Sequence, residues 1–342
     1  MKAFAITGVK ETGYVEKDER PVGAGEVRLK VDYVGFCGSD LNTYRGLNPL
    51  VKLPRVPGHE ISATIAEVGA GVPDAWKVGQ RVAVSPYTNC GMCTSCLKGR
   101  PNCCRYNETL GVQRDGAMQP FVVVPWTKLY DASGLSAEHV ALVEPLTVGG
   151  HAADRSGAME DDIAVVIGCG AVGLGAVLGL ARKNARRVIA VDVDDEKLAL
   201  AKEFGATDAV NSAKTDLHAA LDEMTEGRGP NVVIEAVGLP ATFRAAVEEV
   251  AFAGTVVYIG YAKAPVEYET KLFVQKELDI RGSRNATPQN FRRVIDFARR
   301  GLFPIGKMLT KAYSFSFSDA GQALADWNAA PGKVCRFLVK VS

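Results

Sequence analysis

The sequence has almost no excess of charge of either sign. It contains 40 lysines and arginines against 39 aspartates and glutamates, which gives a formal net charge of +1. Proteins that bind nucleic acid or an anionic membrane through their charge carry a basic patch, and this chain shows no such footprint. We therefore expect neither nucleic acid nor a membrane among its partners.

The sequence also lacks an apolar run long enough to span a bilayer. Its longest apolar stretch runs from Val172 to Ala181, contains three glycines and is followed at once by Arg182 and Lys183. A transmembrane helix needs about 20 apolar residues. Residues 1–20 lack the apolar core of a secretion signal and become charged within ten residues. We expect a cytoplasmic protein.

Length and composition indicate a soluble globular protein with two domains. A chain of 342 residues is longer than one ordinary domain, and each half is large enough for its own core. Hydrophobic residues make up 47% and charged residues 23%, the usual balance for a globular protein. No internal repeat or low-complexity segment interrupts this pattern.

The first 150 residues consist of short apolar segments broken by glycine and proline. Short strands at this spacing, without a long helical period between them, predict an all-β barrel or sandwich. The predicted strands are 26–36, 61–72, 79–87 and 118–125.

From about Asp161 the pattern changes to apolar strands that alternate with helices. Buried strands alternating with helices imply parallel βαβ units. The predicted strands number six, as in a complete dinucleotide-binding sheet. They are 163–168, 186–192, 208–212, 231–238, 255–261 and 277–283, with helices from Val172 and over 196–204, 217–224 and 242–250. After Arg284 we predict a helix over 288–301 and strands over 311–317 and 333–341, and we expect this tail to return to the N-terminal β domain.

A glycine-rich turn follows the first of these strands. Gly168, Gly170 and Gly173 form G-C-G-A-V-G between strand and helix. The first glycine permits the tight turn, the second lets the backbone approach a pyrophosphate, and the third lets the helix pack closely. Asp192 closes the next strand about twenty residues on, as the dinucleotide fingerprint requires. The alternative is a tight turn that binds nothing.

Asp192 also bears on the choice of cofactor. A carboxylate there accepts hydrogen bonds from ribose hydroxyls and repels a 2′-phosphate. The next residues are Val193, Asp194 and Asp195, with no arginine or serine to bind that phosphate. The sequence favours NAD over NADP.

Five of the eight cysteines lie within fifteen residues. Cys90, Cys93, Cys96 and Cys104 offer four thiolates from one short loop, which suits a closed tetrahedral Zn²⁺. A disulfide across so short a loop would be strained. The alternatives are a redox cluster or reactive thiols. Because Cys103 adjoins Cys104, chemistry alone does not fix which of the two is the fourth ligand.

A second set of metal-ligand types is scattered along the chain. Cys37 lies in G-F-C-G-S-D, His59 in P-G-H-E and Glu144 in V-E-P-L. Each also has an ordinary interpretation: a small buried hydrophobe, a turn residue and a helix N-terminal charge beside Pro145. Spacing alone does not show that they converge.

Together these segments resemble the zinc-containing medium-chain alcohol and polyol dehydrogenases, over essentially the whole chain. The motifs that carry the resemblance are C-G-S-D at 37–40, G-H-E at 58–60 with a later Val-Gly turn, V-G-Q-R-V at 78–82, the four-cysteine loop, E-P-L at 144–146 near His151 and Ala152, and the nucleotide fingerprint. The resemblance implies an α/β protein with a GroES-like β-barrel catalytic domain over 1–150, to which 285–342 return, and a Rossmann NAD-binding domain with a doubly wound, parallel six-stranded sheet over 151–284. It places the active site in the cleft between them.

The resemblance assigns the site residues position by position. It implies two zinc ions per chain. Cys37, His59 and Glu144 match the ligands of the catalytic zinc, and Cys90, Cys93, Cys96 and Cys104 those of a structural zinc. Glu60 matches an acidic residue that can approach or exchange onto the metal, and Ser39 matches the hydroxyl that takes the substrate proton. Sorbitol, xylitol and threonine dehydrogenases also have glutamate where many alcohol dehydrogenases have a second cysteine.

The same comparison implies where NAD binds. Its phosphate contacts fall on the turn from Gly168 to Gly173, which includes Ala171 and Val172. Its ribose contacts fall on Asp192 and Lys197. Val237 and Ser283 lie where the family's backbone cradles the nicotinamide. Dimers or tetramers formed through the nucleotide domain are a further expectation from the family.

The chain departs from the family at one position of the proton pathway. Many relatives have histidine three residues after the serine, where this chain has Asn42. An amide cannot accept and release a proton at neutral pH, so we expect a different route, with water beside Glu60.

The substrate class follows from two segments. S-D-L-N-T-Y-R-G at 39–46 and G-S-R-N-A-T at 282–287 look closest to dehydrogenases of sugar acids such as L-galactonate or L-idonate, and to starvation-sensing relatives. Arg45 and Arg284 could hold a carboxylate by forked hydrogen bonds, with Tyr44 lining the pocket. The alternative is that both are ordinary surface or cofactor-facing arginines.

These features predict an enzyme that transfers hydride from a secondary alcohol of a sugar acid or polyol, a small-molecule substrate, to NAD. Two other functions stay open: a neutral polyol or L-threonine dehydrogenase, and a non-catalytic protein that binds NAD and zinc, since a fold does not guarantee activity. A zinc-free quinone reductase of the wider superfamily would lack Cys37, His59 and the cysteine loop.

Overall fold

The computed structural model describes residues 1–309, 314–330 and 335–342 and divides the chain into two compact units. Unit 1 comprises residues 1–144, 287–300 and 305–342, and unit 2 comprises residues 145–286 and 301–304. The units differ from the expected domains at residues 145–150, 285–286 and 301–304, which we expected in the catalytic domain for 145–150, 285–286 and 301–304 alike only in part: 145–150, 285–286 and 301–304 all lie in unit 2. They belong to unit 2, where the ring of Phe303 packs on Phe204 with 5.2 Å between centroids.

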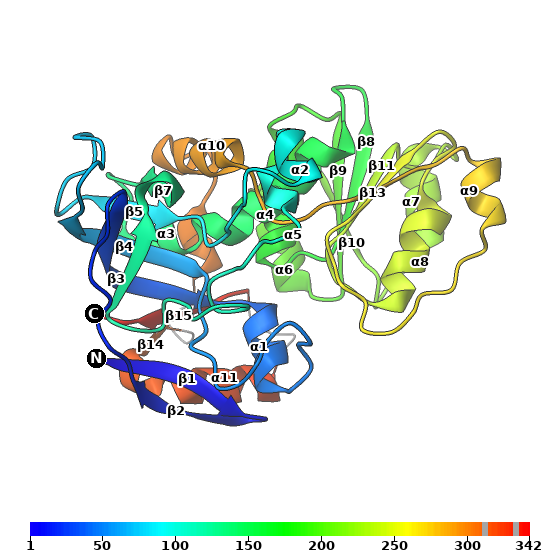
Figure 1. Cartoon of the computed structure of the whole chain (residues 1–342). Coiled ribbons are helices and arrows are strands. Elements are labelled where there is room, and N and C mark those ends of the chain that lie inside the picture. Colours follow the sequence, from blue (N-terminus) through cyan, green and yellow to red (C-terminus); the bar gives the residue numbers. More distant parts are fainter. Residues whose placement is uncertain (310–313, 331–334) are drawn as a thin grey trace. The chain divides into compact units, whose positions relative to one another are not determined.

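Unit 1 is built on a mainly antiparallel sheet (Figure 1). Within the described residues this sheet has seven strands in the order β14-β15-β3-β4-β5-β7, and β6 pairs with β3 beside that path. A separate hairpin, β1-β2, accompanies it. The strands are β1 (Lys2–Gly8), β2 (Glu11–Glu16), β3 (Glu26–Phe36), β4 (Glu60–Val68), β5 (Arg81–Val84), β6 (Phe121–Pro125), β7 (Leu129–Asp131), β14 (Ser314–Ser316) and β15 (Phe337–Lys340).

Apolar side chains on alternate positions bury one face of this sheet. In β3, for instance, Leu29 and Val31 are fully buried whereas Lys30 between them is exposed. They join a core that includes Phe4, Ile61 and Phe337. The alternation explains why β3, β4, β5 and β6 could be predicted from the sequence. The hairpin β1-β2 and strand β7 were not predicted.

Short helices complete unit 1. They are α1 (Gly38–Tyr44), α2 (Thr94–Leu97), α3 (Ala137–Ala141), α10 (Pro288–Arg299) and α11 (Ala320–Ala329), while α4 (Val143–Ser156) begins in unit 1 and continues in unit 2. The helix predicted over 288–301 is α10, and α11 was not predicted. Of the strands predicted over 311–317 and 333–341, residues 311–313 and 333–334 lie outside the described residues.

Unit 2 contains a parallel sheet. Its six described strands have the order β10-β9-β8-β11-β12-β13, so that the chain reverses direction across the sheet between β8 and β11. This is the order of a doubly wound nucleotide-binding sheet and confirms the predicted fold class. The strands are β8 (Ile163–Ile167), β9 (Arg187–Asp192), β10 (Asp208–Asn211), β11 (Val232–Glu235), β12 (Thr255–Tyr258) and β13 (Asp279–Gly282).

Helices connect these strands, as Figure 1 shows for the green and yellow part of the chain. Val165, Ile189 and Val233 from three neighbouring strands are fully buried in a core that the helices cover. The short α9 was not predicted. The helices are α5 (Ala171–Ala181), α6 (Asp195–Glu203), α7 (Leu217–Thr225), α8 (Pro240–Glu249) and α9 (Lys271–Gln275).

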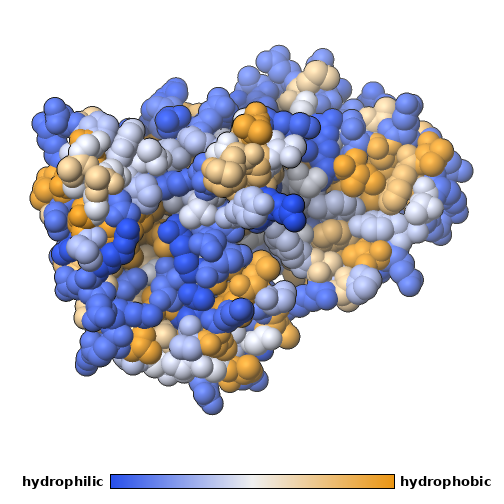
Figure 2. Space-filling model, in the orientation of Figure 1, coloured by the Kyte–Doolittle hydropathy of each residue, from blue (hydrophilic) through white to orange (hydrophobic). Residues whose placement is uncertain are grey.

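The face of the molecule drawn in Figure 2 is largely polar. Figure 2 shows hydrophilic residues over most of the visible face, with hydrophobic residues in small groups between them. Scattered exposed apolar side chains of this kind are ordinary on folded proteins. No helix among the described residues is long and apolar enough to cross a membrane.

Candidate metal centres and nucleotide site

Cys37, His59 and Glu60 meet within unit 1. Cys37 precedes α1, and the adjacent pair His59–Glu60 stands where β4 begins. One potential ligand atom from each residue lies within 4.8 Å of the other two. His59 and Glu60 are buried, and Cys37 is half-buried. A thiol, an imidazole and a carboxylate from distant segments thus share a space of the size that one metal ion needs.

Local turns bring these side chains together. Gly58 has a φ of +104°, and a Cβ there would stand 2.6 Å from Cγ1 of Val34, so the turn before His59 requires glycine. On the opposite segment the carboxylate of Asp40 accepts a hydrogen bond of 2.9 Å from the backbone N–H of Cys37. Oδ2 of Asp40 also lies 3.9 Å from Nδ1 of His59. Asp40 therefore fixes the backbone at Cys37 and faces the imidazole.

The charges in this cluster favour the metal-binding form of the thiol. Burial acts to raise the pKa of Cys37, but the hydrogen bond and the charge of His59 outweigh it and lower the pKa to about 7. Burial acts to lower the pKa of His59, but the Asp40 carboxylate and Cys37 outweigh it and raise the pKa well above its ordinary value. The positive charge of His59 stabilises the thiolate of Cys37. A bound metal cation would supply that positive charge instead.

Glu60 is paired with a buried arginine. Nη1 of Arg336 lies 3.2 Å from Oε1 of Glu60, and it also donates a 3.0 Å hydrogen bond to the backbone carbonyl of Phe36. Glu60 is completely buried, and burial raises its pKa well above its ordinary value despite Arg336. Arg336 reaches this position because β15 pairs with β3, with Phe337 opposite Phe36.

Glu144 lies near the cluster but is held by a different partner. It stands in the first turn of α4, and its Oε1 accepts a hydrogen bond from the buried hydroxyl of Tyr87. Its charge acts on the pKa of His59, which places it in the same neighbourhood. Among the described residues, however, the group that satisfies the 4.8 Å criterion contains Cys37, His59 and Glu60, and Glu144 is not a member. The geometry therefore gives Glu60 the more direct position of the two carboxylates.

The other residues predicted for this region differ in their burial and in their hydrogen bonds. The hydroxyl of Ser39 is buried, and within the described part of the chain it has no hydrogen-bond partner. Tyr44 is buried in the core of unit 1. Arg45 donates from Nε to Oδ1 of Asn328 at 2.7 Å and from Nη2 to the Asn328 carbonyl at 3.3 Å. Its guanidinium is thus already bound to α11.

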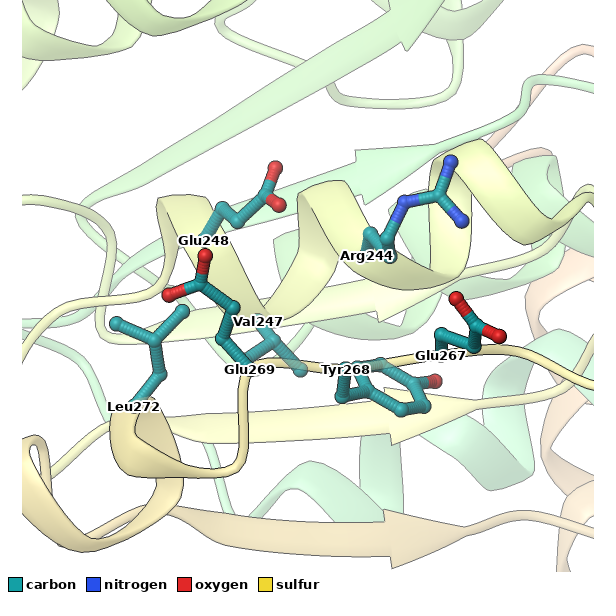
Figure 3. A pocket seen from close by; sticks show the side chains of 7 residues that line it. All are labelled: Arg244, Val247, Glu248, Glu267, Tyr268, Glu269 and Leu272. Atoms are coloured by element: carbon teal, nitrogen blue, oxygen red, sulfur yellow. The ribbon is translucent and has the colours of Figure 1, made fainter.

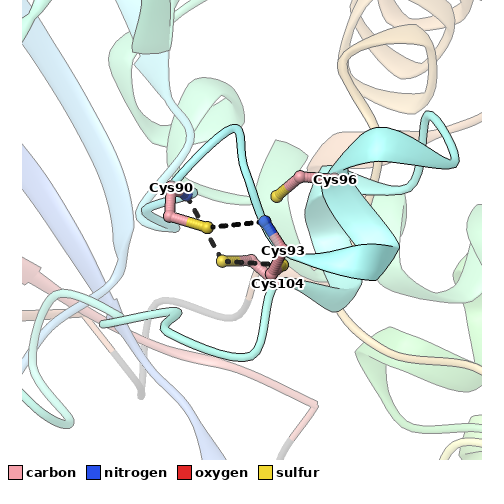
Figure 4. Close-up of side chains that lie close together, drawn as sticks. All are labelled: Cys90, Cys93, Cys96 and Cys104. Atoms are coloured by element: carbon pink, nitrogen blue, oxygen red, sulfur yellow. Dashed lines mark hydrogen bonds between the residues drawn. The ribbon is translucent and has the colours of Figure 1, made fainter.

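The second cysteine group forms one compact cluster in unit 1 (Figure 4). The sulfur atoms of Cys90, Cys93, Cys96 and Cys104 all lie within 4.8 Å of one another. Backbone N–H groups point at these sulfurs: that of Cys93 donates to Cys90 at 3.3 Å and that of Cys90 donates to Cys104 at 3.3 Å. Such donors stabilise thiolates.

The fifth cysteine of this loop faces elsewhere. Sγ of Cys103 accepts a hydrogen bond from Nδ2 of Asn102 at 3.5 Å, and Cys103 is not a member of the four-sulfur group among the described residues. Cys104 is completely buried. Inside the group, the Ser95 hydroxyl and nearby backbone N–H groups lower the pKa of Cys93 to about 5. The position of Cys104 identifies it as the fourth candidate ligand.

The glycine-rich turn of unit 2 has the close contacts that the fingerprint requires. Gly168 has a φ of +97°, and a Cβ on Gly173 would stand 1.8 Å from the Gly168 carbonyl oxygen. Only glycine at 173 lets α5 begin so close to the end of β8. Gly170 is the N-cap of α5, and space is open where its Cβ would be. The turn therefore leaves an open backbone surface at a helix N-terminus, as a pyrophosphate needs.

Asp192 is fixed beside this turn. Its Oδ2 accepts a 2.7 Å hydrogen bond from the N–H of Cys169, and its Oδ1 accepts one of 2.8 Å from the N–H of Val193. Of the other predicted cofactor residues, Val237 is 44% exposed. Ser283 is buried, and its hydroxyl has no hydrogen-bond partner in the described ranges. Arg284, predicted for the substrate, is exposed in unit 2.

Two hollows lie apart from the Cys37 cluster and the glycine-rich turn, and the lining of the second includes Cys93 of the four-sulfur group. One, of about 370 Å³, lies against α8 in unit 2 (Figure 3). The other, of about 520 Å³, lies on the cysteine loop. Charged residues line both, which does not suit an apolar ligand. The first is lined by Arg244, Val247, Glu248, Glu267, Tyr268, Glu269 and Leu272, and the second by residues that include Lys98, Arg100 and Arg105.

Comparison with known families agrees with this organisation. Residues 23–134 match the model of the alcohol dehydrogenase GroES-like domain, and residues 171–300 match that of the zinc-binding dehydrogenases. Together the two matches span more than half of the chain. The chain belongs to the zinc-binding alcohol dehydrogenase family. This confirms the resemblance and the expectation of a dehydrogenase.

Individual relatives match along nearly the whole length. Starvation-sensing protein RspB of Escherichia coli K12 is 35% identical, with 100% of both chains covered. L-Galactonate-5-dehydrogenase of the same organism is 32% identical over 92% of each chain. The solved structure of an rspB alcohol dehydrogenase of Escherichia coli CFT073, complexed with NADH, has a TM-score of 0.90 and 34% identity, covering 99% of each chain.

Three residues of the candidate site were not predicted from the sequence. Asp40 lies inside the C-G-S-D motif, so the motif itself could have drawn attention to it. Tyr87 stands three residues before Cys90, and nothing in its sequence context indicates a contact with Glu144. Arg336 lies more than 270 residues beyond Glu60 in the sequence, and only the pairing of β15 with β3 explains their contact.

Proposed function

We propose that this protein is a zinc-dependent dehydrogenase that moves hydride from a secondary alcohol of a polyol or sugar acid to NAD. The observation that carries the proposal is the convergence of Cys37, His59 and Glu60 in a chain whose family members bind zinc. Sulfur, nitrogen and oxygen donors in one set suit Zn²⁺, and three protein ligands leave a position for substrate.

The residues present fit a catalytic zinc. Cys37 and His59 would hold it, together with Glu60 or Glu144, and the loop of Cys90, Cys93, Cys96 and Cys104 would hold a second, structural zinc. When bound, the catalytic ion lowers the pKa of a coordinated alcohol. Arg336 and Tyr87 would keep the two carboxylates in place.

Ser39 is our candidate for the first proton acceptor. Its hydroxyl is buried and has no partner within the described residues, so it has a free acceptor and a free donor for a substrate hydroxyl. Asn42, one turn further along α1, cannot continue the transfer because an amide does not exchange protons at neutral pH. We propose that the proton leaves through water beside Glu60.

NAD would bind to unit 2. Gly168, Gly170 and Gly173 leave the backbone open to a pyrophosphate, and Asp192 offers carboxylate oxygens where the ribose is expected. Lys197 is our further candidate for the ribose, and Val237 and Ser283 for the nicotinamide. A fixed carboxylate at 192 disfavours the 2′-phosphate of NADP.

The substrate class divides into two candidates. The 32% identity to an L-galactonate dehydrogenase supports a sugar acid. The hydrogen bonds of Arg45 to Asn328 support a neutral polyol, because they occupy donors that a carboxylate clamp would use. Arg284 is then the remaining candidate for a carboxylate, and equal catalytic efficiency on an aldonate and its parent polyol would exclude that role.

The decisive experiment measures zinc and activity together. Elemental analysis should find two zinc ions per chain, and a panel of aldonates, polyols and L-threonine should show NAD reduction with at least one class. A protein that binds NAD and zinc but reduces no NAD with any of them would be a non-catalytic relative, and the proposal would fail.

We also propose a cytoplasmic location and a homo-dimer or homo-tetramer. Among the described residues none of the eight cysteines forms a disulfide, as a reducing compartment favours. Strand β13 is an edge of the described sheet of unit 2, and its Ile280 is 43% exposed, so it offers unpaired backbone to another copy. Light scattering coupled to size-exclusion chromatography would measure the assembly.

A further inference from the structure

A completely buried carboxylate stands at the edge of the unit 2 sheet. Glu235 is the last residue of β11, and its exposed fraction is 0%. Its Oε1 accepts hydrogen bonds from the N–H of Val237 at 2.9 Å, the N–H of Gly238 at 2.7 Å and the hydroxyl of Thr242 at 2.7 Å. One oxygen atom therefore holds the loop that connects β11 to α8.

Glu235 occupies a central position among three loops. It pairs with Ile167 at the end of β8 on one side and with Tyr258 at the end of β12 on the other. The carboxyl ends of parallel strands lie at one edge of a sheet, where nucleotides bind. The loops that follow all three strands therefore begin beside Glu235.

These loops are packed tightly against one another. A Cβ on Gly168 would stand 2.6 Å from Cγ2 of Val237, so the glycine-rich turn touches the loop that Glu235 holds. A Cβ on Gly260 would stand 2.4 Å from the nitrogen of Gly238 and 2.5 Å from Oε2 of Glu235. A shift of the Glu235 carboxylate would therefore move both neighbouring loops.

No cation pairs with this carboxylate among the described residues. Its side-chain partners there are the neutral groups of Val237, Gly238 and Thr242, and its Oε2 has no hydrogen-bond partner. Two backbone N–H groups that donate to one carboxyl oxygen stabilise the ionised form of that carboxyl. An ionised Glu235 would place a full negative charge inside the protein at the cofactor edge.

We propose that Glu235 is a positioning residue of the nucleotide site, and that its charge favours the oxidised nicotinamide over the reduced one. This rests on the proposed function, because it takes NAD as the ligand and Val237 as a neighbour of the nicotinamide. The nicotinamide ring of NAD⁺ carries a positive charge, which NADH lacks. A buried negative charge close by stabilises the cation selectively, since screening in the interior is weak.

The test replaces Glu235 by the amide of the same shape. In Glu235→Gln we expect the Kd for NAD⁺ to rise about tenfold and the Kd for NADH about threefold, a difference that reflects the lost charge. Calorimetry would measure NAD⁺ binding, and the fluorescence of bound NADH would measure the reduced form. Both readouts use the full-length protein without substrate.

Two further variants separate the charge from the packing. Thr242→Val removes one donor to Oε1 and leaves the charge, so both affinities should fall by the same factor, about threefold. Thr225→Val removes a buried hydroxyl of α7 that bonds Leu221 and Gly229, and it should leave both affinities within about twofold.

The outcomes are distinguishable. An unchanged ratio of NAD⁺ to NADH affinity in Glu235→Gln would overturn the role of the charge, and unchanged affinities in Thr242→Val would overturn the positioning role even if Glu235→Gln does not fold. A wild-type protein that binds neither form would refute the proposed function instead.

Discussion

Nη1 of Arg336 lies 3.2 Å from Oε1 of Glu60, and neither side chain has more than 5% of its surface exposed. Because a buried carboxylate that loses its paired arginine is left poorly compensated, Arg336→Met should lower the free energy of unfolding by about 3–5 kcal/mol. Denaturant titration would measure this loss. The exposed pair of Arg300 with Asp296 is the matched control, and Arg300→Met should cost less than about 0.5 kcal/mol. Similar losses in both variants would contradict the role given to Arg336.

Removal of a ligand of the catalytic metal should abolish turnover without loss of cofactor binding. Cys37→Ser replaces a thiolate by a hydroxyl that binds Zn²⁺ weakly, so we expect one zinc per chain instead of two and no detectable NAD reduction. The affinity for NADH, for which we propose a site in unit 2, should stay within about twofold. Elemental analysis and NADH fluorescence would measure the two quantities. Wild-type turnover in a variant that has lost the second zinc would overturn the mechanism.

Position 42 should control the pH dependence of turnover. Asn42→His places a titratable group one turn after Ser39, and we expect the acidic limb of the kcat profile to move because imidazole titrates near pH 6.5. Stopped-flow or steady-state rates between pH 5 and 9 would show the shift. An identical profile in wild type and variant would mean that residue 42 takes no part in proton transfer.

The two neighbouring cysteines of the loop should behave differently. Cys104→Ser removes one of four clustered sulfurs, so the loop should lose its zinc and the melting temperature should fall by several degrees. Cys103→Ser alters a thiol outside the cluster and should keep two zinc ions per chain. Zinc content and thermal unfolding of both variants decide the assignment, and a reversed result would make Cys103 the ligand.

Asp131 should contribute stability that disappears in acid. Hydrogen bonds from Ser133, Gln80 and Arg299 outweigh the effect of burial and lower its pKa from the ordinary 3.8 to about 2. A carboxyl with a lowered folded-state pKa stabilises the protein above its unfolded pKa, and the contribution is lost as the pH falls toward 2. Unfolding free energies from pH 5 to 2 should therefore fall more steeply in the wild type than in Asp131→Asn. Parallel curves would contradict this assignment.

The sequence predicted the parts of the molecule in which local pattern and structure coincide. Strand β3 could be predicted because apolar and polar side chains alternate along it, and the Gly168 turn because a fixed spacing serves one backbone geometry. The β1-β2 hairpin was missed since it contains no strong alternation. Helix α11 was not predicted because its sequence, AGQALADWNA, shows only a weak apolar stripe.

In the candidate site, too, local features could be predicted from the sequence and contacts between distant segments could not. The four-cysteine cluster is local, so its spacing sufficed to predict it. The partner of Glu60 could not be predicted, because Arg336 comes from a strand whose pairing depends on the whole sheet of unit 1. Glu144 was expected among the ligands from the resemblance alone. No sequence pattern indicates the hydrogen bond from Tyr87 that holds this carboxylate.

The pairing of β15 with β3 has a consequence for the order of folding during synthesis. The ribosome makes residues 145–286 of unit 2 as one uninterrupted segment, and domains generally fold as units while the chain emerges. β3 emerges early but receives its neighbour β15 only after unit 2 has been made. Unit 2 can therefore fold first, whereas the cluster around Glu60 is complete only after Arg336 has been synthesised.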